Sequence, residues 1–111
     1  MSYELIYYGK CSTCVKGLAL LQENGINPVL NNYMTEHLSA KQIGEIATKT
    51  GDIKNIIREK TARELGVDLS QNDDEILEII AKNPSLLQRP ILIKGEKAIV
   101  GRPIEEMLKL K

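Results

Sequence analysis

The opening of the chain constrains the fold most, because a pair of cysteines there separates a short apolar run from an amphipathic segment. The run over residues 3–8 ends at Gly9, which is typical of a buried strand. Residues 15–21 carry apolar side chains at helical spacing, and Gly25 suits the end of that helix. Residues 27–33 have the pattern of a second strand. This order predicts a parallel strand pair joined by a right-handed crossover.

The middle of the chain has the pattern of several helices. Ser39 opens a capping-box pattern, and Gly51 suits the end of the helix that follows it. Isoleucines within residues 53–57 indicate a short second helix that reaches toward Arg58. A third helix is expected over residues 73–84, with acidic residues in its first turn and a proline at its end.

The C-terminal part has the pattern of a hairpin followed by a helix. Residues 90–94 and 97–100 are apolar runs, and Gly95 lies where a type II′ turn needs glycine. Pro103 suits the first position of a closing helix. The element order β-α-β, helices, β-β-α predicts an α/β fold with a small mixed sheet. With no repeat and no Pro/Gly/Ser-rich linker, we expect a single domain over residues 1–111.

The cysteine pair is the strongest chemical signal. Cys11 is expected at the N-terminus of the first helix, where unpaired N–H groups and the helix dipole favour a thiolate. Lys10 and Lys16 add positive charge nearby, and a lowered pKa makes a thiol nucleophilic near neutral pH. Cys14 follows about one helical turn later and could form a disulfide with Cys11. The alternative is a pair of buried, inert thiols.

Other chemistries have weaker support. A structural zinc site needs about four ligands, whereas the chain offers two cysteines and one histidine, so we expect no metal. That histidine, His37, has the context of a surface residue and is not expected to be catalytic. The acidic residues within 68–75 are better explained as a solvated helix start than as a metal site.

Composition disfavours nucleic acid and membrane as partners. The 15 basic and 15 acidic residues cancel, and the four tyrosines are the only aromatic side chains, so a phosphate-binding or base-stacking surface is not expected. No apolar run is long enough to cross a bilayer, and the chain opens without the pattern of a secretory signal. A cytoplasmic monomer is therefore the default expectation.

Two of the arginines occur in the same kind of context, each directly before a proline. Arg89-Pro90 precedes one strand of the predicted hairpin, and Arg102-Pro103 follows the other. Arginine binds oxyanions through a planar fork that lysine lacks, so two such forks pointing toward a thiolate would form an oxyanion pocket. The alternative is that they are surface arginines that happen to precede prolines.

The chain resembles the ArsC/Spx-like family, which comprises the glutaredoxin-coupled arsenate reductases and their relatives. The resemblance covers nearly the whole chain and includes an Ile-Ile-Arg-Glu-Lys stretch followed by Glu-Leu-Gly in the middle. The matching segments are residues 7–11 (YYGKC), the cysteine turn over 11–16, 56–60, 64–66, 88–91 (QRPI) and 101–103 (GRP).

The resemblance implies a thioredoxin-like fold in which the middle helices are an insertion. It implies that Cys11 is the nucleophile and that Arg58, Arg89 and Arg102 bind the oxyanion. Pro90 matches a position that is commonly a cis proline beside the active-site thiol. In such reductases no cofactor is bound: the thiolate attacks arsenate, glutathione attacks the adduct, and glutaredoxin or thioredoxin acts as the protein partner in reduction.

Within the family, the signals divide between enzyme and regulator. Arsenate reductases typically have only the first cysteine of the turn, whereas Cys14 matches the redox pair of Spx-like regulators that bind the RNA polymerase α subunit. Residues 101–103 resemble the enzyme branch. Our first hypothesis is a thiol-dependent oxidoreductase acting on arsenate or a similar oxyanion. A Spx-like regulator with a Cys11–Cys14 disulfide switch and a thioredoxin-type protein-disulfide reductase are the alternatives.

Overall fold

A four-stranded mixed sheet is the centre of the molecule, as seen in a computed structural model that describes residues 2–111. The strands lie in the order β2-β1-β3-β4. The β1–β2 pair is parallel, and the β1–β3 and β3–β4 pairs are antiparallel. The strands are β1 (Glu4–Tyr7), β2 (Val29–Asn32), β3 (Ile91–Lys94) and β4 (Lys97–Val100).

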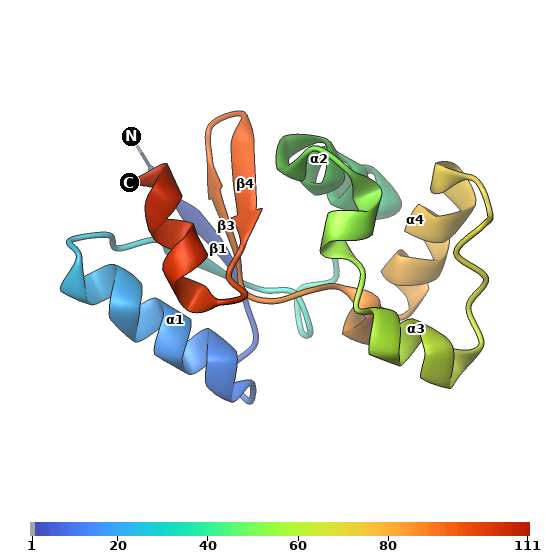
Figure 1. Cartoon of the computed structure of the whole chain (residues 1–111), viewed down its shortest axis with the longest axis horizontal. Helices are drawn as coiled ribbons and strands as arrows, with labels where there is room; N and C mark the ends of the chain where they lie inside the picture. Colours follow the sequence, from blue (N-terminus) through green and yellow to red (C-terminus); the bar gives the residue numbers. More distant parts are fainter. Residues whose placement is uncertain (1) are drawn as a thin grey trace.

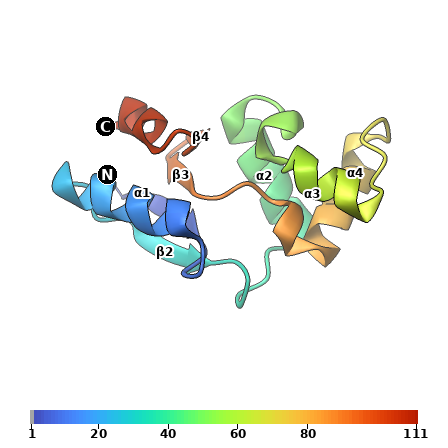
Figure 2. The same cartoon turned by 60° about the horizontal axis from the view of Figure 1, so that its bottom comes forward.

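One face of the sheet is covered by two helices. The helix α1 (Ser12–Glu23) joins the parallel strands, and the 3-10 helix η3 (Ile104–Leu110) packs beside it (Figures 1 and 2). A small apolar core joins these helices to the sheet, because alternate residues of each strand point to this side. Its buried members are Leu5, Leu21, Ile26, Leu92 and Met107.

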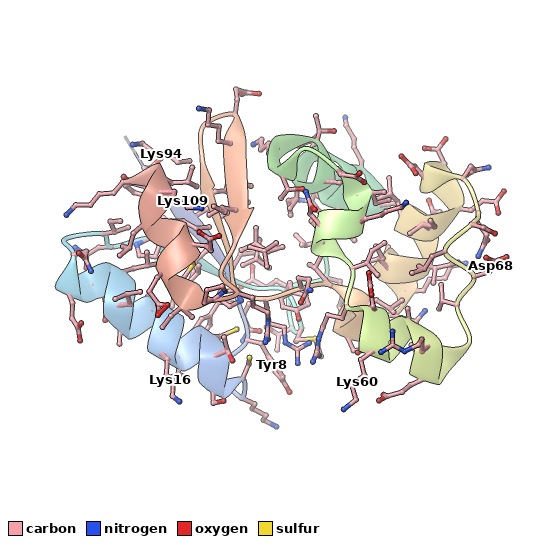
Figure 3. All side chains as sticks on the ribbon, in the orientation of Figure 1. Tyr8, Lys16, Lys60, Asp68, Lys94 and Lys109 are labelled. Atoms are coloured by element: carbon pink, nitrogen blue, oxygen red, sulfur yellow. The ribbon has the colours of Figure 1, made fainter. Side chains whose placement is uncertain are left out.

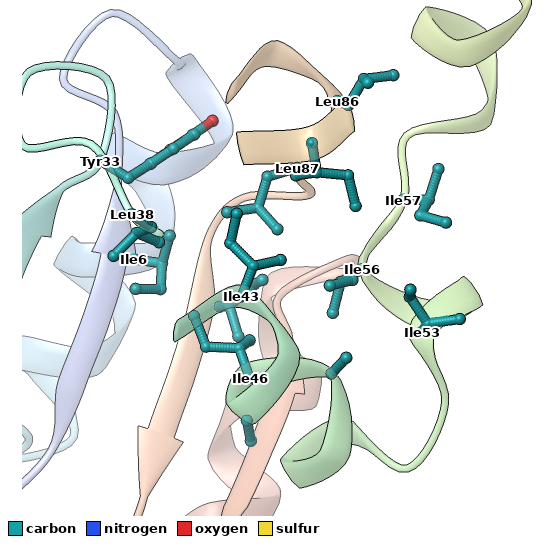
Figure 4. Packing of buried hydrophobic residues seen from close by; sticks show 14 of the residues in the cluster. Ile6, Tyr33, Leu38, Ile43, Ile46, Ile53, Ile56, Ile57, Leu86 and Leu87 are labelled. Carbon is teal, nitrogen blue, oxygen red and sulfur yellow. The ribbon is translucent and has the colours of Figure 1, made fainter. Parts of the chain in front are cut away.

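The other face carries the helical insertion, defined here as residues 40–86. It consists of α2 (Ala40–Thr50), η1 (Ile53–Ile56), α3 (Glu59–Leu65), α4 (Asp73–Lys82) and η2 (Pro84–Leu86). Ile6, Ile91 and Ile93 of the sheet belong to the same core as buried isoleucines and leucines of the insertion. We call this cluster the large core, and Figure 4 shows part of it. None of the helices described in residues 2–111 is long and apolar enough to cross a membrane.

Much of the predicted local structure is confirmed. The parallel strand pair with its helix, the hairpin and the mixed sheet are all present. The Ser39 side chain accepts a hydrogen bond from the Gln42 N–H, and the Gln42 side chain accepts one from the Ser39 N–H. Gly51 ends α2 in the left-handed region. Gly95 has φ 59° and, with no positive φ at Glu96, the two-residue turn fits the II′ type.

Two expectations about helices need correction. The helix α3, after Arg58, was not predicted, because only Ala62 of this short segment is buried and the apolar period is weak. The signals it does have are Glu59 in the first turn and a left-handed Gly66 at its end. The closing helix is a 3-10 helix in which Pro103 is the capping residue rather than the first helical one.

Candidate active site

The two cysteines lie where β1 passes into α1, and their environments differ. Cys11 is the N-cap of α1, is partly exposed, and makes no side-chain capping bond. Its backbone N–H donates to the Tyr8 carbonyl oxygen at 3.0 Å, which closes the turn between strand and helix. Cys14 lies in the first turn of α1 and its exposed fraction is 0%. Neither cysteine is in a disulfide, so the site is in its dithiol form.

These environments shift the two pKa values in opposite directions. Partial burial raises the pKa of Cys11, but the neighbouring backbone N–H and thiol of Cys14, together with Arg89, outweigh it and bring the pKa down to about 7. Burial raises the pKa of Cys14 to about 12, and the neighbouring Cys11 sulfur adds to this. Near neutral pH a large share of Cys11 is therefore thiolate, while Cys14 beside it stays a protonated thiol.

The register of the sheet places two of the arginines in one row with two tyrosines. Within the sheet Tyr7 pairs with Asn32, Ile6 with Ile91, and Ile91 with Val100. Continuing each register past the ends of the strands gives one row of four residues, in the order Tyr33, Tyr8, Arg89 and Arg102.

Contacts along this row hold the two arginines beside Cys11. Arg102 donates from Nε to the carbonyl oxygen of Arg89 at 3.0 Å, and its Nη2 lies 4.0 Å from Cys11 Sγ. Arg89 is part-buried and donates from Nη1 to Tyr33 Oη at 3.4 Å, while its Cζ lies 5.6 Å from the centroid of the Tyr8 ring. The thiolate of Cys11 therefore faces two guanidinium groups.

Arg58 reaches the same region from the insertion. It is the N-cap of α3, and its backbone N–H donates to the Leu86 carbonyl oxygen at 2.8 Å. Burial and the positive charges of Arg89 and Arg102 lower the pKa of Arg58, while the Cys11 sulfur raises it. Its interaction with Cys11 is thus electrostatic, and the structure records no hydrogen bond between the two among the described residues.

The three arginines carry uncompensated positive charge. Within residues 2–111 the single ion pair joins Lys109 to Glu106, so no carboxylate neutralises these guanidinium groups. Arg89 Nε is buried and has no hydrogen-bond partner among the described residues. A buried donor without a partner is costly unless something binds to it. An anion bound beside Cys11 would both supply that partner and compensate the charge.

Pro90 follows Arg89 directly, and its ring lies close to Gly17 of α1 and to Gly101. The Arg89–Pro90 peptide bond is cis, and so is the Arg102–Pro103 bond. Pro90 is fully buried, and its carbonyl oxygen accepts a hydrogen bond from the Gly101 N–H at 2.8 Å. This hydrogen bond joins the residue before β3 to the residue after β4, next to the thiols.

Other candidate positions lie outside this cluster. His37 is exposed, as expected from its context. No group of three metal-ligating side chains occurs in the described part of the chain. A surface hollow with a volume of about 770 Å³ lies along α2 and α4 and includes Lys41, Asp73 and Asp74, but none of the cysteines or clustered arginines. This hollow is therefore not part of the thiol site.

Sequence analysis did not identify Tyr8 and Tyr33 as members of the site. A signal was available, because each tyrosine closes one of two strands predicted to be parallel. Ends of adjacent parallel strands meet at the same edge of a sheet. The sequence pattern did not show that Arg89 is the residue these tyrosines contact, since Arg89 is 56 residues from Tyr33 in the chain.

Comparison with known proteins decides the family. The model of the ArsC family matches residues 7–110 of this chain. The chain belongs to the ArsC family. It is 33% identical over 115 residues to an arsenate reductase of Haemophilus influenzae, with 99% of each chain covered. It is also 38% identical over 101 residues to the global transcriptional regulator Spx of Listeria innocua, covering 87% of this chain and 77% of that protein.

The fold agrees with this membership. The structure of an arsenate reductase from Vibrio cholerae superimposes with a TM-score of 0.91 at 29% identity, covering 100% of this chain and 98% of the other. The predicted thioredoxin-like α/β fold with a helical insertion is thereby confirmed. This ArsC-family scaffold is similar both to proteins named as enzymes and to proteins named as regulators.

Proposed function

We propose that this ArsC-family protein is a thiol-dependent reductase of arsenate or a similar tetrahedral oxyanion. Cys11 is the nucleophile, and Arg58, Arg89 and Arg102 bind the oxyanion. The observation that carries the proposal is the low-pKa Cys11 with Arg102 Nη2 4.0 Å from its sulfur and the unpartnered Arg89 Nε nearby. Guanidinium groups placed where negative charge gathers favour attack by a thiolate on an anion that would otherwise repel it.

In the first step the Cys11 thiolate attacks the arsenic atom. A sulfur–arsenic bond forms, an arsenic–oxygen bond breaks, and the oxygen leaves as water after it takes up protons. Arsenic stays in the +5 state, and the arginines hold the remaining oxygens. Cys14 continues to donate a hydrogen bond to the Cys11 sulfur until that sulfur loses its charge.

In the second step a thiolate attacks Cys11 Sγ. A disulfide forms, the sulfur–arsenic bond breaks, and its electron pair remains on arsenic, which leaves as arsenite in the +3 state. The attacking thiol is glutathione, as the family resemblance implies, or Cys14. Adduct formation removes the Cys11 charge that helps to raise the pKa of Cys14, so Cys14 becomes easier to ionise at this stage. Glutaredoxin or thioredoxin then reduces the disulfide.

The decisive experiment is NADPH consumption with arsenate, glutathione, glutaredoxin and glutathione reductase. We expect arsenate-dependent turnover in the wild type and none in Cys11→Ser, with Cys14→Ser reporting whether the second thiol is needed. His37→Ala is a matched control, because His37 is exposed and outside the cluster. Undiminished turnover in Cys11→Ser would refute the proposal.

A second candidate is a redox-sensing regulator of the Spx type. It is supported by the 38% identity to the Listeria innocua regulator and by the presence of Cys14 beside Cys11. In this function a Cys11–Cys14 disulfide would change a surface that binds the RNA polymerase α subunit. Binding to the C-terminal domain of that subunit, measured with oxidised and with reduced protein, tests it. Equal failure to bind in both states would remove this candidate.

A further inference from the structure

Two tyrosines contact Arg89 from neighbouring strands. Tyr8 follows β1 and Tyr33 follows β2, and the continued register places the two tyrosines side by side. Arg89, which precedes β3, lies next to Tyr8 on the opposite side of β1 from Tyr33. Neither tyrosine is a nucleophile or a ligand of the proposed chemistry. Both nevertheless lie in the row that ends at Arg102 beside Cys11.

Tyr33 holds one end of the guanidinium through its hydroxyl. Its side chain is 1% exposed, and its Oη accepts the hydrogen bond from Arg89 Nη1 at 3.4 Å. Figure 4 shows the ring at the edge of the large core, with the hydroxyl directed away from Leu38 and Ile6. Burial raises the pKa of Tyr33, so the hydroxyl stays neutral. It therefore orients Arg89 without cancelling the positive charge that the site uses.

Tyr8 holds the face of the same guanidinium. The centroid of its ring lies 5.6 Å from Arg89 Cζ, within the range of a cation–π contact. Figure 3 shows Tyr8 near the N-terminal end of α1. With Tyr33 at Nη1 and Tyr8 at the face, Arg89 Nε is left buried and without a partner among the described residues.

We propose that Tyr8 and Tyr33 form a tyrosine clamp, a pair of positioning residues that hold the Arg89 guanidinium toward Cys11 and toward an oxyanion bound beside it. An arginine has several rotatable bonds, so an unclamped guanidinium would lose orientation entropy when it binds an anion. The part that concerns the oxyanion rests on the proposed function. The part that concerns Cys11 depends only on the thiol.

Several groups face Cys11 besides Arg89. They are Cys14 on α1, Arg102 after β4 and Arg58 before α3. Only Arg89 is contacted by both tyrosines. Loosening the clamp should therefore weaken one of several stabilising influences on the thiolate, and a moderate effect is expected.

The test compares Tyr33→Phe and Tyr8→Leu with the wild type. The rate of Cys11 alkylation by iodoacetamide is followed against pH, and arsenate binding is measured by calorimetry. Because a hydrogen bond to a charged group is removed, we expect the pKa of Cys11 to rise by about half a unit and arsenate affinity to fall by about two- to tenfold in Tyr33→Phe. Tyr8→Leu, which removes the ring face, should change both in the same direction.

Tyr3→Phe is the matched control. The Tyr3 hydroxyl also makes one hydrogen bond, although as a donor, to the Leu110 carbonyl oxygen at 3.4 Å, and the Tyr3 ring lies 5.1 Å from Lys94 Nζ. It thus makes the same kinds of contact at the opposite end of β1, away from the thiols. Its removal should leave the pKa of Cys11 and arsenate affinity unchanged.

A double-mutant cycle separates positioning from general loosening of the structure. In an Arg89→Gln background, Tyr33→Phe should have no further effect on the pKa of Cys11, because the group it orients is gone. Wild-type values in both tyrosine variants, or an undiminished Tyr33→Phe effect in the Arg89→Gln background, would overturn the clamp. If the wild type binds no arsenate, the proposed function fails, while the pKa of Cys11 still decides the clamp.

Discussion

The N-termini of α2 and α4 in the insertion are built differently from the N-terminus of α1 in the sheet half. In the insertion, α2 begins with the Ser39 capping box, and α4 begins with Asn72, whose side chain accepts from the Glu75 N–H. In the sheet half, α1 begins with Cys11, which makes no capping hydrogen bond. The side-chain caps satisfy N–H groups and stabilise the insertion locally, whereas the start of α1 keeps its N–H groups for a sulfur whose charge changes.

The difference shows where each half obtains its stability. A side-chain cap contributes about 1 kcal/mol, which α1 forgoes. α1 is held instead by packing, with Leu21 in the small core and Gly17 close against Met107 and Pro90. The sheet half thus supplies Cys11, Cys14, Arg89 and Arg102, while the insertion supplies Arg58 from the uncapped start of α3.

The largest expected effect tests whether the two halves unfold together. Leu92→Ala removes a fully buried side chain from the small core, and Ile80→Ala removes one from the large core. Each should lower the free energy of unfolding by about 3 kcal/mol. Urea denaturation followed by circular dichroism should show one transition for both variants. A separate early transition in Ile80→Ala alone would mean that the insertion unfolds independently.

A smaller effect is expected from adding a single carbon at two glycines. A Cβ at Gly101 would lie 2.9 Å from both Met107 Sδ and Pro90 Cγ, so Gly101→Ala should destabilise by about 1–3 kcal/mol. A Cβ at Gly44, inside α2, would lie 3.2 Å from the flexible end of Leu77. There the helix propensity of alanine, up to about 1 kcal/mol, should offset the contact. Equal destabilisation of the two variants in urea would contradict this contrast.

Exchanging the cap chemistry should change stability by about 1 kcal/mol in opposite directions. Asn72→Ala removes the cap of α4 and should destabilise. Cys11→Ser places a good capping hydroxyl at the start of α1 and should stabilise, while alkylation at this position is lost. Thermal unfolding should be compared below pH 7, where Cys11 in the wild type is largely protonated. Destabilisation by Cys11→Ser would show that α1 does not accept a side-chain cap.

The smallest expected effect is the pH dependence of stability, because Cys11 is partly exposed and solvent screens its interactions. The pKa of Cys11 falls from 9.0 to about 7 on folding, so the folded state binds this proton less tightly than the unfolded state. The resulting stabilisation is full above pH 9 and is lost as the pH falls through about 7. The stability of the wild type relative to Cys11→Ser should therefore increase between these values. Cys14, whose pKa rises from 9.0 to about 12 on folding, opposes this trend only as the pH approaches 9, where the unfolded thiol begins to ionise. Because Cys11→Ser also contains Cys14, this contribution is largely removed by the comparison.

Signals within a few residues of one another were readable from the sequence. The cysteine turn, the Ser39 capping box, the Gly95 hairpin and the acidic start of α4 each depend on neighbouring residues, and all lie where they were predicted. The helix α3 was not readable, because it buries little apolar surface. The family resemblance named the three arginines, but their placement required the strand register and the packing of the insertion.

The sequence by itself determined the strand–helix order, the position of Cys11 at a helix start and the ArsC-family signature. Only the tertiary structure decided that Tyr33, Tyr8, Arg89 and Arg102 form one row, because pairing of distant strands depends on register rather than on local pattern. It also decided which thiol ionises. Cys11 and Cys14 are chemically identical and three residues apart. Burial raises the pKa of Cys14, whereas Cys11 is partly exposed and flanked by arginines, and its pKa is lowered.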